Sequence, residues 1–153
     1  MVDTRQQEGK HALKHAQLAE RYKLARTKLY VGDYMLVGGT VAIDTKRDIR
    51  ELASCLRQGH ERFRAELVRA RDAGIELWVL TETGEVGDLA ELAEWTEPSW
   101  SAKRHGGTAP LEGRQLARTA ATMRERYGAH FAFCRPEAAG EAVAWILEEE
   151  KRS

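Results

Sequence analysis

Hydrophobic and polar positions follow a helical period over most of the chain. Ala12, Leu13, Ala16 and Ala19 predict a first amphipathic helix over residues 9–26. Apolar residues keep a similar period over residues 49–73, where Gly59 interrupts it and Gly74 ends it. This pattern predicts two consecutive helices. Further helices are predicted over residues 87–94, 113–127 and 136–150, the last opened by a proline in its first turn.

Short apolar runs between these helices predict strands. Residues 29–37 and 40–46 flank Gly38-Gly39, a dipeptide that accepts the positive φ angles of a two-residue hairpin turn. Residues 75–80 are typical of a buried central strand reached by a helical crossover, and residues 130–134 predict another strand. Residues 98–110 have no period and are predicted to form an exposed loop. The element order predicts an α/β fold with a central mixed β-sheet flanked by helices.

Composition adds the class of protein. The length of 153 residues fits one domain, 1–153, with 42% hydrophobic and 31% charged residues, as in globular proteins. No apolar run is long enough for a membrane span, and the first seven residues lack the apolar core of a signal peptide. Cys55 and Cys134 do not form a spaced metal or disulfide framework. We therefore expect no membrane partner and a cytoplasmic location.

Charge is balanced overall and uneven along the chain. There are 24 basic and 24 acidic residues, so no global positive field points to nucleic acid. Basic residues concentrate between positions 46 and 72, whereas every charged residue from 82 to 97 is acidic. A basic stretch of this kind is more often a solvated helix face than a phosphate track.

The predicted hairpin brings chemistry-bearing residues together. A two-residue turn pairs Val37 with Thr40, and counting outward places Asp33 opposite Asp44. Directly opposite side chains have Cβ atoms about 5 Å apart, so two carboxylates there require compensation, which a divalent cation supplies. Lys46 lies on the same face as Asp44 because successive side chains alternate. In the alternative interpretation, Asp33 lies at a strand entry and the other two form an exposed charge pair.

This donor set suits a hard cation. Mg²⁺ takes oxygen ligands, commonly one or two carboxylates with waters and substrate phosphates, so Asp33 and Asp44 are a sufficient protein contribution. The backbone carbonyl of Thr45 is a candidate third ligand. Lys46 is placed to orient the nucleophile or stabilise charge on the phosphate. The chemistry predicted is phosphodiester hydrolysis with Mg²⁺, for which Mn²⁺ is expected to substitute.

Several segments resemble a known family in their order and spacing. They are Val2-Asp3-Thr4-Arg5-Gln6, Val31-Gly32-Asp33-Tyr34, Ala42-Ile43-Asp44-Thr45-Lys46, Glu51-Leu52-Ala53-Ser54-Cys55-Leu56 and His60-Glu61-Arg62-Phe63. Over residues 2–83 the chain resembles the XPF/Mus-type nuclease domain of the PD-(D/E)XK nucleases. The segment from Arg126 to Cys134 is similar to short phage-encoded members of this group.

The resemblance implies a restriction-endonuclease-like fold and particular site residues. It implies that Asp33 and Asp44 are the main metal ligands, that Asp3 is a further acidic residue at the metal, and that Lys46 is the catalytic lysine. It also implies branched, flap or junction DNA as substrate and a possible homodimer. The family's helix-hairpin-helix module has no room in this chain. A bacterial or phage-infected cell is the expected setting.

The chain departs from the family pattern at three places. Asp44-Thr45-Lys46 stands where the family usually has Glu-Arg-Lys, so Arg47 is the nearest arginine for a phosphate. Gln6 replaces the acid of the family's early Asp-x-Arg-Glu pattern. The acidic residue that follows the lysine in the family corresponds to Glu51 with one residue inserted.

Other residues are candidates for contact with DNA. Phosphate contacts are expected from Arg5, Arg47, Arg57, His60, Arg62 and Arg64. Trp95, Trp100 and His105 flank the predicted loop and are candidates for stacking on an unpaired base, although core packing is the more common role of tryptophan.

The leading hypothesis is a metal-dependent endodeoxyribonuclease that selects DNA by structure. A catalytically silent nuclease-fold subunit, which binds DNA or pairs with an active partner, is the main alternative, and Gln6 and Thr45 favour it. An interaction module without a nucleic-acid role is a third possibility, in keeping with the neutral net charge.

Overall fold

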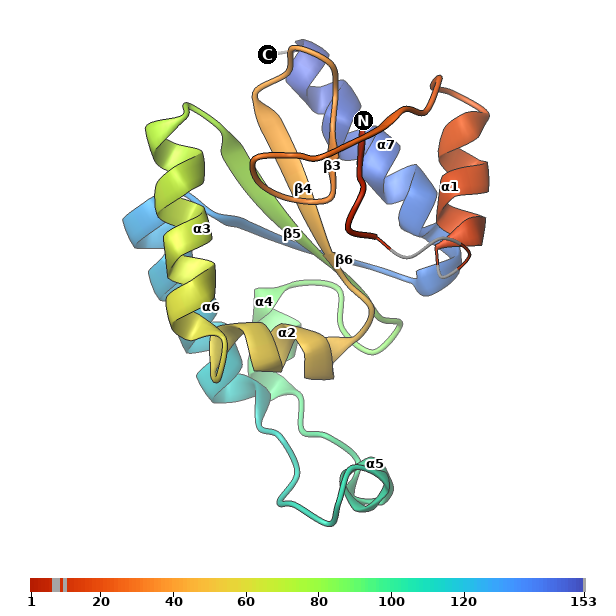
Figure 1. Ribbon diagram of the computed structural model, residues 1–153. Helices are drawn as coiled ribbons and strands as arrows, with labels where there is room; N and C mark the ends of the chain where they lie inside the picture. Colours follow the sequence, from red (N-terminus) through yellow and green to blue (C-terminus); the bar gives the residue numbers. More distant parts are fainter. Residues whose placement is uncertain (7–8, 10, 153) are drawn as a thin grey trace.

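A computed structural model describes residues 1–6, 9 and 11–152, and its centre is a six-stranded mixed sheet (Figure 1). The strands are β1 (Val2–Asp3), β2 (Arg26–Thr27), β3 (Tyr34–Met35), β4 (Val41–Lys46), β5 (Glu76–Glu82) and β6 (His130–Cys134), in the order β2-β1-β3-β4-β5-β6. The helices are α1 (Ala12–Ala19), α2 (Ile49–Leu56), α3 (His60–Asp72), α4 (Leu89–Glu94), α5 (Ser99–Arg104), α6 (Gly113–Tyr127) and α7 (Ala139–Arg152), with a 3₁₀ turn at Pro136–Ala138. β3 pairs antiparallel with β1 and β4, whereas β4, β5 and β6 are mutually parallel. The predicted fold class is confirmed.

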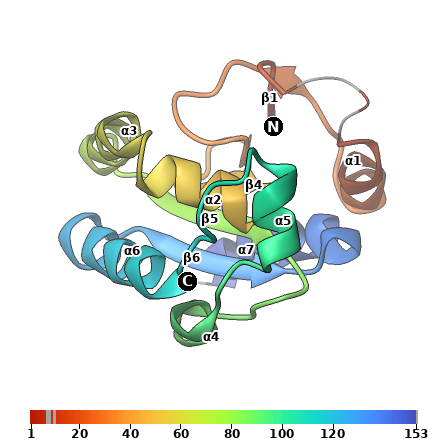
Figure 2. The same cartoon turned by 90° about the horizontal axis from the view of Figure 1, so that it is seen from below.

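Helices cover both faces of the sheet. Figure 2 shows α3 and α6 on one side of the strands and α1 and α7 on the other. Side chains alternate along β4 between two hydrophobic cores, one on each face of the sheet. Ala42 packs with the helices α2, α3 and α6, and Ile43 packs with α1 and α7. The two-sided burial explains the continuous apolar runs at residues 41–43 in β4 and 77–80 in β5.

The hairpin has the predicted register and a different turn. Tyr34 pairs with Ile43 and Met35 with Ala42, as counting from the predicted turn requires. β3 is much shorter than the predicted 29–37, whereas β4 is one residue shorter than the predicted 40–46, and the turn is closed by a hydrogen bond of 3.0 Å from Gly39 N to Leu36 O. Thr40 is drawn out of the hairpin because its N–H and hydroxyl donate to Glu150 of α7. A helix distant in sequence therefore contacts the residue that follows the turn.

The first helix was predicted too long and with the wrong buried face. It spans only Ala12–Ala19, and Leu13 of the predicted apolar face is 59% exposed. Leu18 and Lys14 are buried instead. The prediction failed because Lys14 has an ion-pair partner on the sheet, which makes burial of a charged residue possible.

The later elements match the sequence more closely. The helix pair separated by Gly59, the strand after Gly74, α6 and β6 lie where they are predicted, whereas the final helix begins at Ala139, after a 3₁₀ turn that contains the proline predicted in its first turn. The predicted loop at 98–110 contains the short helix α5, and the two-residue strands β1 and β2 were not predicted. Within the described residues, no helix is both long and apolar enough to cross a membrane.

Candidate active site

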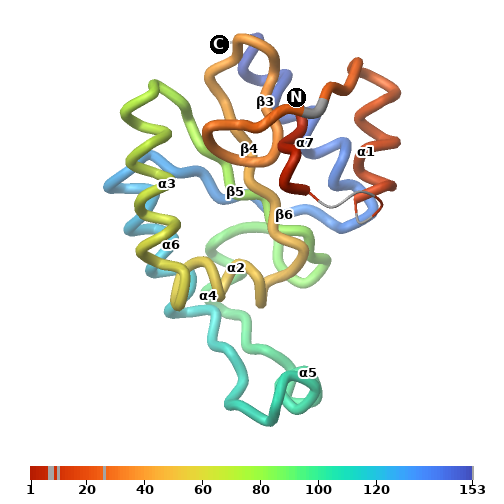
Figure 3. Tube along the Cα trace, in the orientation of Figure 1, coloured from red at the N-terminus to blue at the C-terminus, as the bar shows by residue number. Residues whose placement is uncertain are grey.

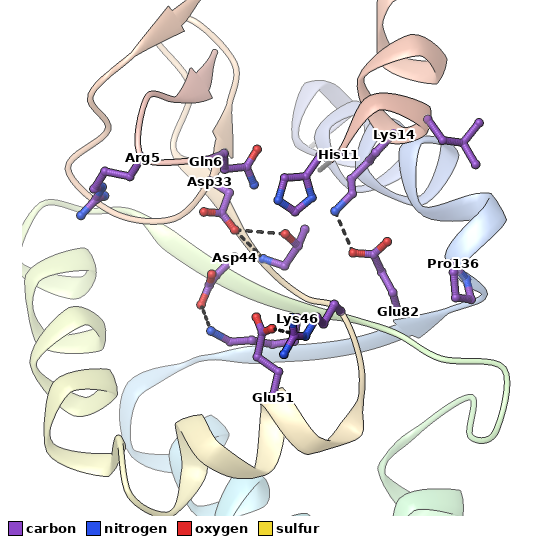
Figure 4. A pocket seen from close by; sticks show the side chains of 13 residues that line it. Arg5, Gln6, His11, Lys14, Asp33, Asp44, Lys46, Glu51, Glu82 and Pro136 are labelled. Carbon is purple, nitrogen blue, oxygen red and sulfur yellow. Dashed lines mark hydrogen bonds and ion pairs between the residues drawn. The ribbon is translucent and has the colours of Figure 1, made fainter. Parts of the chain in front are cut away.

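Asp44 and Lys46 lie on one face of β4, near the end of the strand. Their side chains form an ion pair of 3.0 Å between Lys46 Nζ and Asp44 Oδ2, with exposed fractions of 16% and 13% (Figure 4). The alternation of side chains along a strand brings the two groups together, as predicted. They are not the exposed charge pair of the alternative interpretation.

Asp33 lies just before β3, at the strand entry that the alternative interpretation gave it, and is not paired in the sheet with Asp44 as predicted; its carboxylate nevertheless lines the same pocket. Gly32 precedes it with a φ of 72°, which turns the chain just before β3. The Asp33 N–H donates to Ile43 O at 2.7 Å, and Asp33 O accepts from Asp3 N at 2.8 Å. Its Oδ2 accepts from Thr45 N at 2.8 Å and from Thr45 Oγ1 at 3.1 Å. The carboxylate is thus held against the end of β4 beside Asp44 and Lys46.

The electrostatics of Asp44 follow from its burial. Burial raises the pKa of Asp44 to about 8, Lys46 opposes that rise, and the nearby carboxylates Asp33 and Glu66 add to it. Burial would lower the pKa of Lys46, but the charge of Asp44 outweighs it, and the pKa is raised. The site therefore combines the ammonium group of Lys46 with the carboxyl group of Asp44, whose ionisation the positive charge around it does not fully compensate.

A pocket of about 480 Å³ opens over these groups. Asp33, Asp44, Lys46 and Glu51 line it on the side of β4 and α2, and Lys14 and Glu82 line it on the side of α1 and β5 (Figure 4). Lys14 Nζ lies 2.7 Å from Glu82 Oε2, and both side chains are largely buried. The pocket therefore has two lysine–carboxylate pairs on its walls.

Asp3 and Arg5 form a unit at the rim. Asp3 is 1% exposed, and its carboxylate accepts hydrogen bonds from the backbone and guanidinium of Arg5 and from Leu29 N. Burial opposes ionisation of Asp3, but the hydrogen bonds from Arg5 outweigh it and lower the pKa below its usual value. Asp3 does not line the pocket, whereas Arg5 does. The structure thus places Asp3 as the support of Arg5 and not beside Asp44.

The other residues expected to contact DNA are spread out. Arg47 lines the pocket and pairs with Glu51 at 3.2 Å. Arg57 caps the end of α2, and the remaining three, His60, Arg62 and Arg64, lie along α3 outside the pocket. Arg64 donates to the Tyr127 hydroxyl at 2.8 Å. The structure brings only Arg5 and Arg47 of this set to the pocket.

The donor set fits Mg²⁺ as a cation that keeps much of its own hydration. Among the residues that the structure describes, no three carboxylate, imidazole or thiol side chains converge as a closed metal site would require. Mg²⁺ does not need such a cage, because one or two carboxylates with waters and phosphate oxygens complete its octahedron. Asp33 and Asp44 provide the two carboxylates, and the crowding of negative charge around Asp44 is an environment that a cation stabilises.

Three charged residues were not predicted as site residues: Lys14 and Glu82, which line the pocket, and Glu66, which lies outside its lining. Glu66 of α3 accepts a hydrogen bond of 3.0 Å from Gly32 N and adds negative charge near Asp44. The sequence feature that could have indicated Glu66 is its place between the buried residues Phe63 and Ala70 on one helix face. Glu82 had a weaker signal, as a charged residue at the carboxyl end of a parallel strand. Lys14 had none, because the apolar face of its helix was assigned elsewhere.

Comparison with known proteins shows the fold. No protein-family model matches the chain, and no curated protein matches it. The structure of XPF from Aeropyrum pernix is similar to it with a TM-score of 0.64 and 18% identity, covering 97% of this chain and 64% of that one. The XPF from Aeropyrum pernix in complex with DNA gives a TM-score of 0.66 and 16% identity, covering 99% of this chain and 64% of that one. The chain thus has an XPF-like fold and spans about two thirds of those proteins' length.

Proposed function

We propose that this chain is a metal-dependent endonuclease that hydrolyses phosphodiester bonds in DNA. The observation that carries the proposal is the meeting of Asp33, Asp44 and Lys46 in one pocket at the end of β4. Two carboxylates and a lysine are a sufficient protein set for metal-assisted phosphodiester hydrolysis. The XPF-like fold supports it, since one of the similar structures is a complex with DNA.

Each residue has a role that its environment supports. Asp33 and Asp44 would hold Mg²⁺ or Mn²⁺, together with the carbonyl oxygen of Thr45. When bound, the cation supplies Lewis-acid activation of water and neutralises charge on the phosphate. When Asp44 is ionised, as cation binding would require, its charge raises the pKa of Lys46, so the ammonium keeps its proton and offsets negative charge that develops on the phosphate.

The rim of the pocket suits a polyanion. Arg5 is held by Asp3 with its side chain 62% exposed, and Arg47 is 66% exposed on the opposite wall. Both guanidinium groups are ion-paired, Arg5 with Asp3 and Arg47 with Glu51, and both remain exposed enough to reach DNA phosphates as well. Branched, flap or junction DNA is the proposed substrate, and a homodimer is the proposed assembly, because two copies would present two sets of rim arginines to one DNA.

A silent DNA-binding subunit is the second candidate. Gln6 favours it, because its neutral amide oxygen lies 3.2 Å from His15 Nε2 where the resemblance predicts an acid. In this case DNA binding persists without cleavage, and an active partner supplies the chemistry.

Cleavage of labelled duplex, flap, fork and four-way-junction DNA with Mg²⁺ or Mn²⁺ tests the proposal. Asp44→Ala and Lys46→Ala are each expected to lower the rate by about 100-fold or more, because each removes an electrostatic contribution to the transition state. Asp72→Ala and Lys23→Ala are matched controls at exposed positions and should cut normally. If every DNA substrate stays intact while branched DNA is still shifted on a gel, the nuclease proposal is wrong and the silent DNA-binding subunit is the better description.

A further inference from the structure

Residues 98–110, which we call the arm, extend away from the body of the protein. The arm carries α5 and lies beyond the edge of the sheet at which β4 and β5 end (Figures 1 and 3). Figure 2, viewed from below, shows α5 in front of β4 and α2. The arm therefore projects from the same edge that carries the pocket.

The base of the arm is firmly anchored. Arg50 of α2 donates to both carboxylate oxygens of Glu97, at 2.7 and 2.9 Å, and Glu97 is 4% exposed. The segments on either side of the arm pair with each other, through a bridge between Thr96 and Glu112 and a hydrogen bond from Glu97 N to Leu111 O. An anchored projection holds its tip in a defined place.

The tip exposes an aromatic ring. Trp100 is 60% exposed, although Ala102 two positions later is buried. The Arg104 guanidinium lies over the Trp100 ring, 5.3 Å from its centre, which orients the indole and leaves only the opposite ring face for stacking on a base. Trp95 differs, because it packs against the core and donates from Nε1 to Glu85.

The charge of the arm is one-sided. It contains Lys103, Arg104 and His105 and no acidic residue, although residues 82–97 before it carry only acidic charges. An exposed indole beside cations complements a single nucleic-acid strand, in which every base has a stacking face and every linkage a negative charge. Paired bases in a duplex do not offer that face.

We propose that the arm binds unpaired bases, with Trp100 as the stacking platform and Lys103 and Arg104 as phosphate contacts. This inference rests on the proposed function and deepens it: it assigns to the arm the preference for DNA in which a strand is unpaired near the cleavage site. The anchor through Arg50 sets the position of the arm relative to α2, whose Glu51 lines the pocket.

The test compares fluorescence anisotropy of a labelled duplex with that of a fork of the same duplex carrying two unpaired thymine arms, with EDTA present to prevent cleavage. Trp100→Ala is expected to weaken fork binding about tenfold and to leave duplex binding unchanged. Trp100→Phe should retain most of the fork affinity, because the ring remains. Trp145→Ala is the matched control, since Trp145 is 54% exposed on α7, and it should bind like the wild type.

Equal losses in Trp100→Ala and Trp145→Ala, or equal losses for fork and duplex, would overturn the role of the arm. A changed sedimentation coefficient in Trp100→Ala with unchanged DNA affinity would also overturn it, in favour of a protein contact. These outcomes leave the nuclease in place if Asp44-dependent cleavage persists. Failure of the wild type to bind either DNA in EDTA would overturn the role of the arm, while the cleavage assay with Mg²⁺ tests the nuclease separately.

Discussion

At the scale of single residues, Asp44 best shows how the fold sets the electrostatics of the site. It is a buried carboxylate with Lys46 as its ion-pair partner and with Asp33 and Glu66 close enough to oppose its ionisation. Its position on β4 was predictable because strand alternation is a local property. Its electrostatic state was not, since Glu66 comes from a helix that packs onto the sheet later in the chain.

The raised pKa of Asp44 predicts a pH dependence of stability in metal-free protein. The folded state holds the Asp44 proton up to about pH 8, whereas the unfolded state releases it at the ordinary value near 4. The contribution of Asp44 to the free energy of unfolding is therefore complete below pH 4 and lost as the pH rises toward 8. This free energy falls by at most about 1.4 kcal/mol per pH unit. Urea unfolding at pH 5 and pH 8 in EDTA should show a larger loss for the wild type than for Asp44→Asn.

Asp72→Asn is the control for this experiment, because Asp72 is exposed and should leave the wild-type slope unchanged. If the wild type and Asp44→Asn have the same slope, Asp44 is ionised throughout and the electrostatic description of the site is wrong.

The Lys14–Glu82 pair predicts a large stability loss. Glu82→Gln leaves the buried Lys14 ammonium without its charge partner, and the free energy of unfolding should fall by about 3 kcal/mol. The double substitution Lys14→Met with Glu82→Leu should recover most of this loss, since no buried charge remains. Urea denaturation measures all three proteins.

Glu148→Gln is the matched control for that pair. Glu148 pairs with Arg21 at 3.3 Å with both side chains substantially exposed, so its loss should cost less than about 1 kcal/mol. Equal effects of Glu82→Gln and Glu148→Gln would mean that Lys14 is solvated in solution.

At the scale of elements, the turn at Gly32 positions Asp33. Gly32 has a φ of 72°, and a Cβ added there would lie 3.0 Å from Ile43 O and 3.1 Å from Ala42 Cβ. The apolar run over residues 29–37 was predicted as one strand, but this bend limits β3 to two residues. Periodicity could not reveal the bend, because it depends on the close approach of β4.

Gly32→Ala should therefore cost more than an ordinary glycine substitution. The left-handed conformation alone costs roughly 1 to 2 kcal/mol for a residue with a Cβ, and contact with β4 adds to this at Gly32. Gly74→Ala is the control, since Gly74 has a φ of 71° with nothing within 4 Å of an added Cβ. We expect Gly32→Ala to be less stable than Gly74→Ala by about 1 kcal/mol or more in urea unfolding. Equal stabilities would show that β4 moves to accept the added Cβ without a cost in free energy.

At the scale of the whole molecule, the site is assembled from segments far apart in the chain. The pocket joins the N-terminal segment, α1, the start of β3, the ends of β4 and β5 and the start of α2. Binding of a cation to such a site is linked to folding, because the unfolded chain does not hold these groups together.

Mg²⁺ should therefore stabilise the folded protein. At ten times its dissociation constant, the cation adds about 1.4 kcal/mol, which raises the melting temperature of a protein of this size by about 4 °C. Differential scanning fluorimetry with and without Mg²⁺ measures the shift in the wild type, in Asp33→Asn and in the control Asp72→Asn. The shift should vanish only in Asp33→Asn, and its persistence there would place the cation elsewhere.

The sequence by itself determined the α/β class, most elements after residue 40, and the shared face of Asp44 and Lys46. These follow from local periodicity, glycine positions and strand alternation, which act over a few residues. Tertiary structure alone decided the buried face of α1, the bend before Asp33, the place of Glu66 and the pairing of Lys14 with Glu82 across 68 positions. Such contacts depend on which surfaces meet when the sheet and helices pack, and no local pattern encodes that meeting.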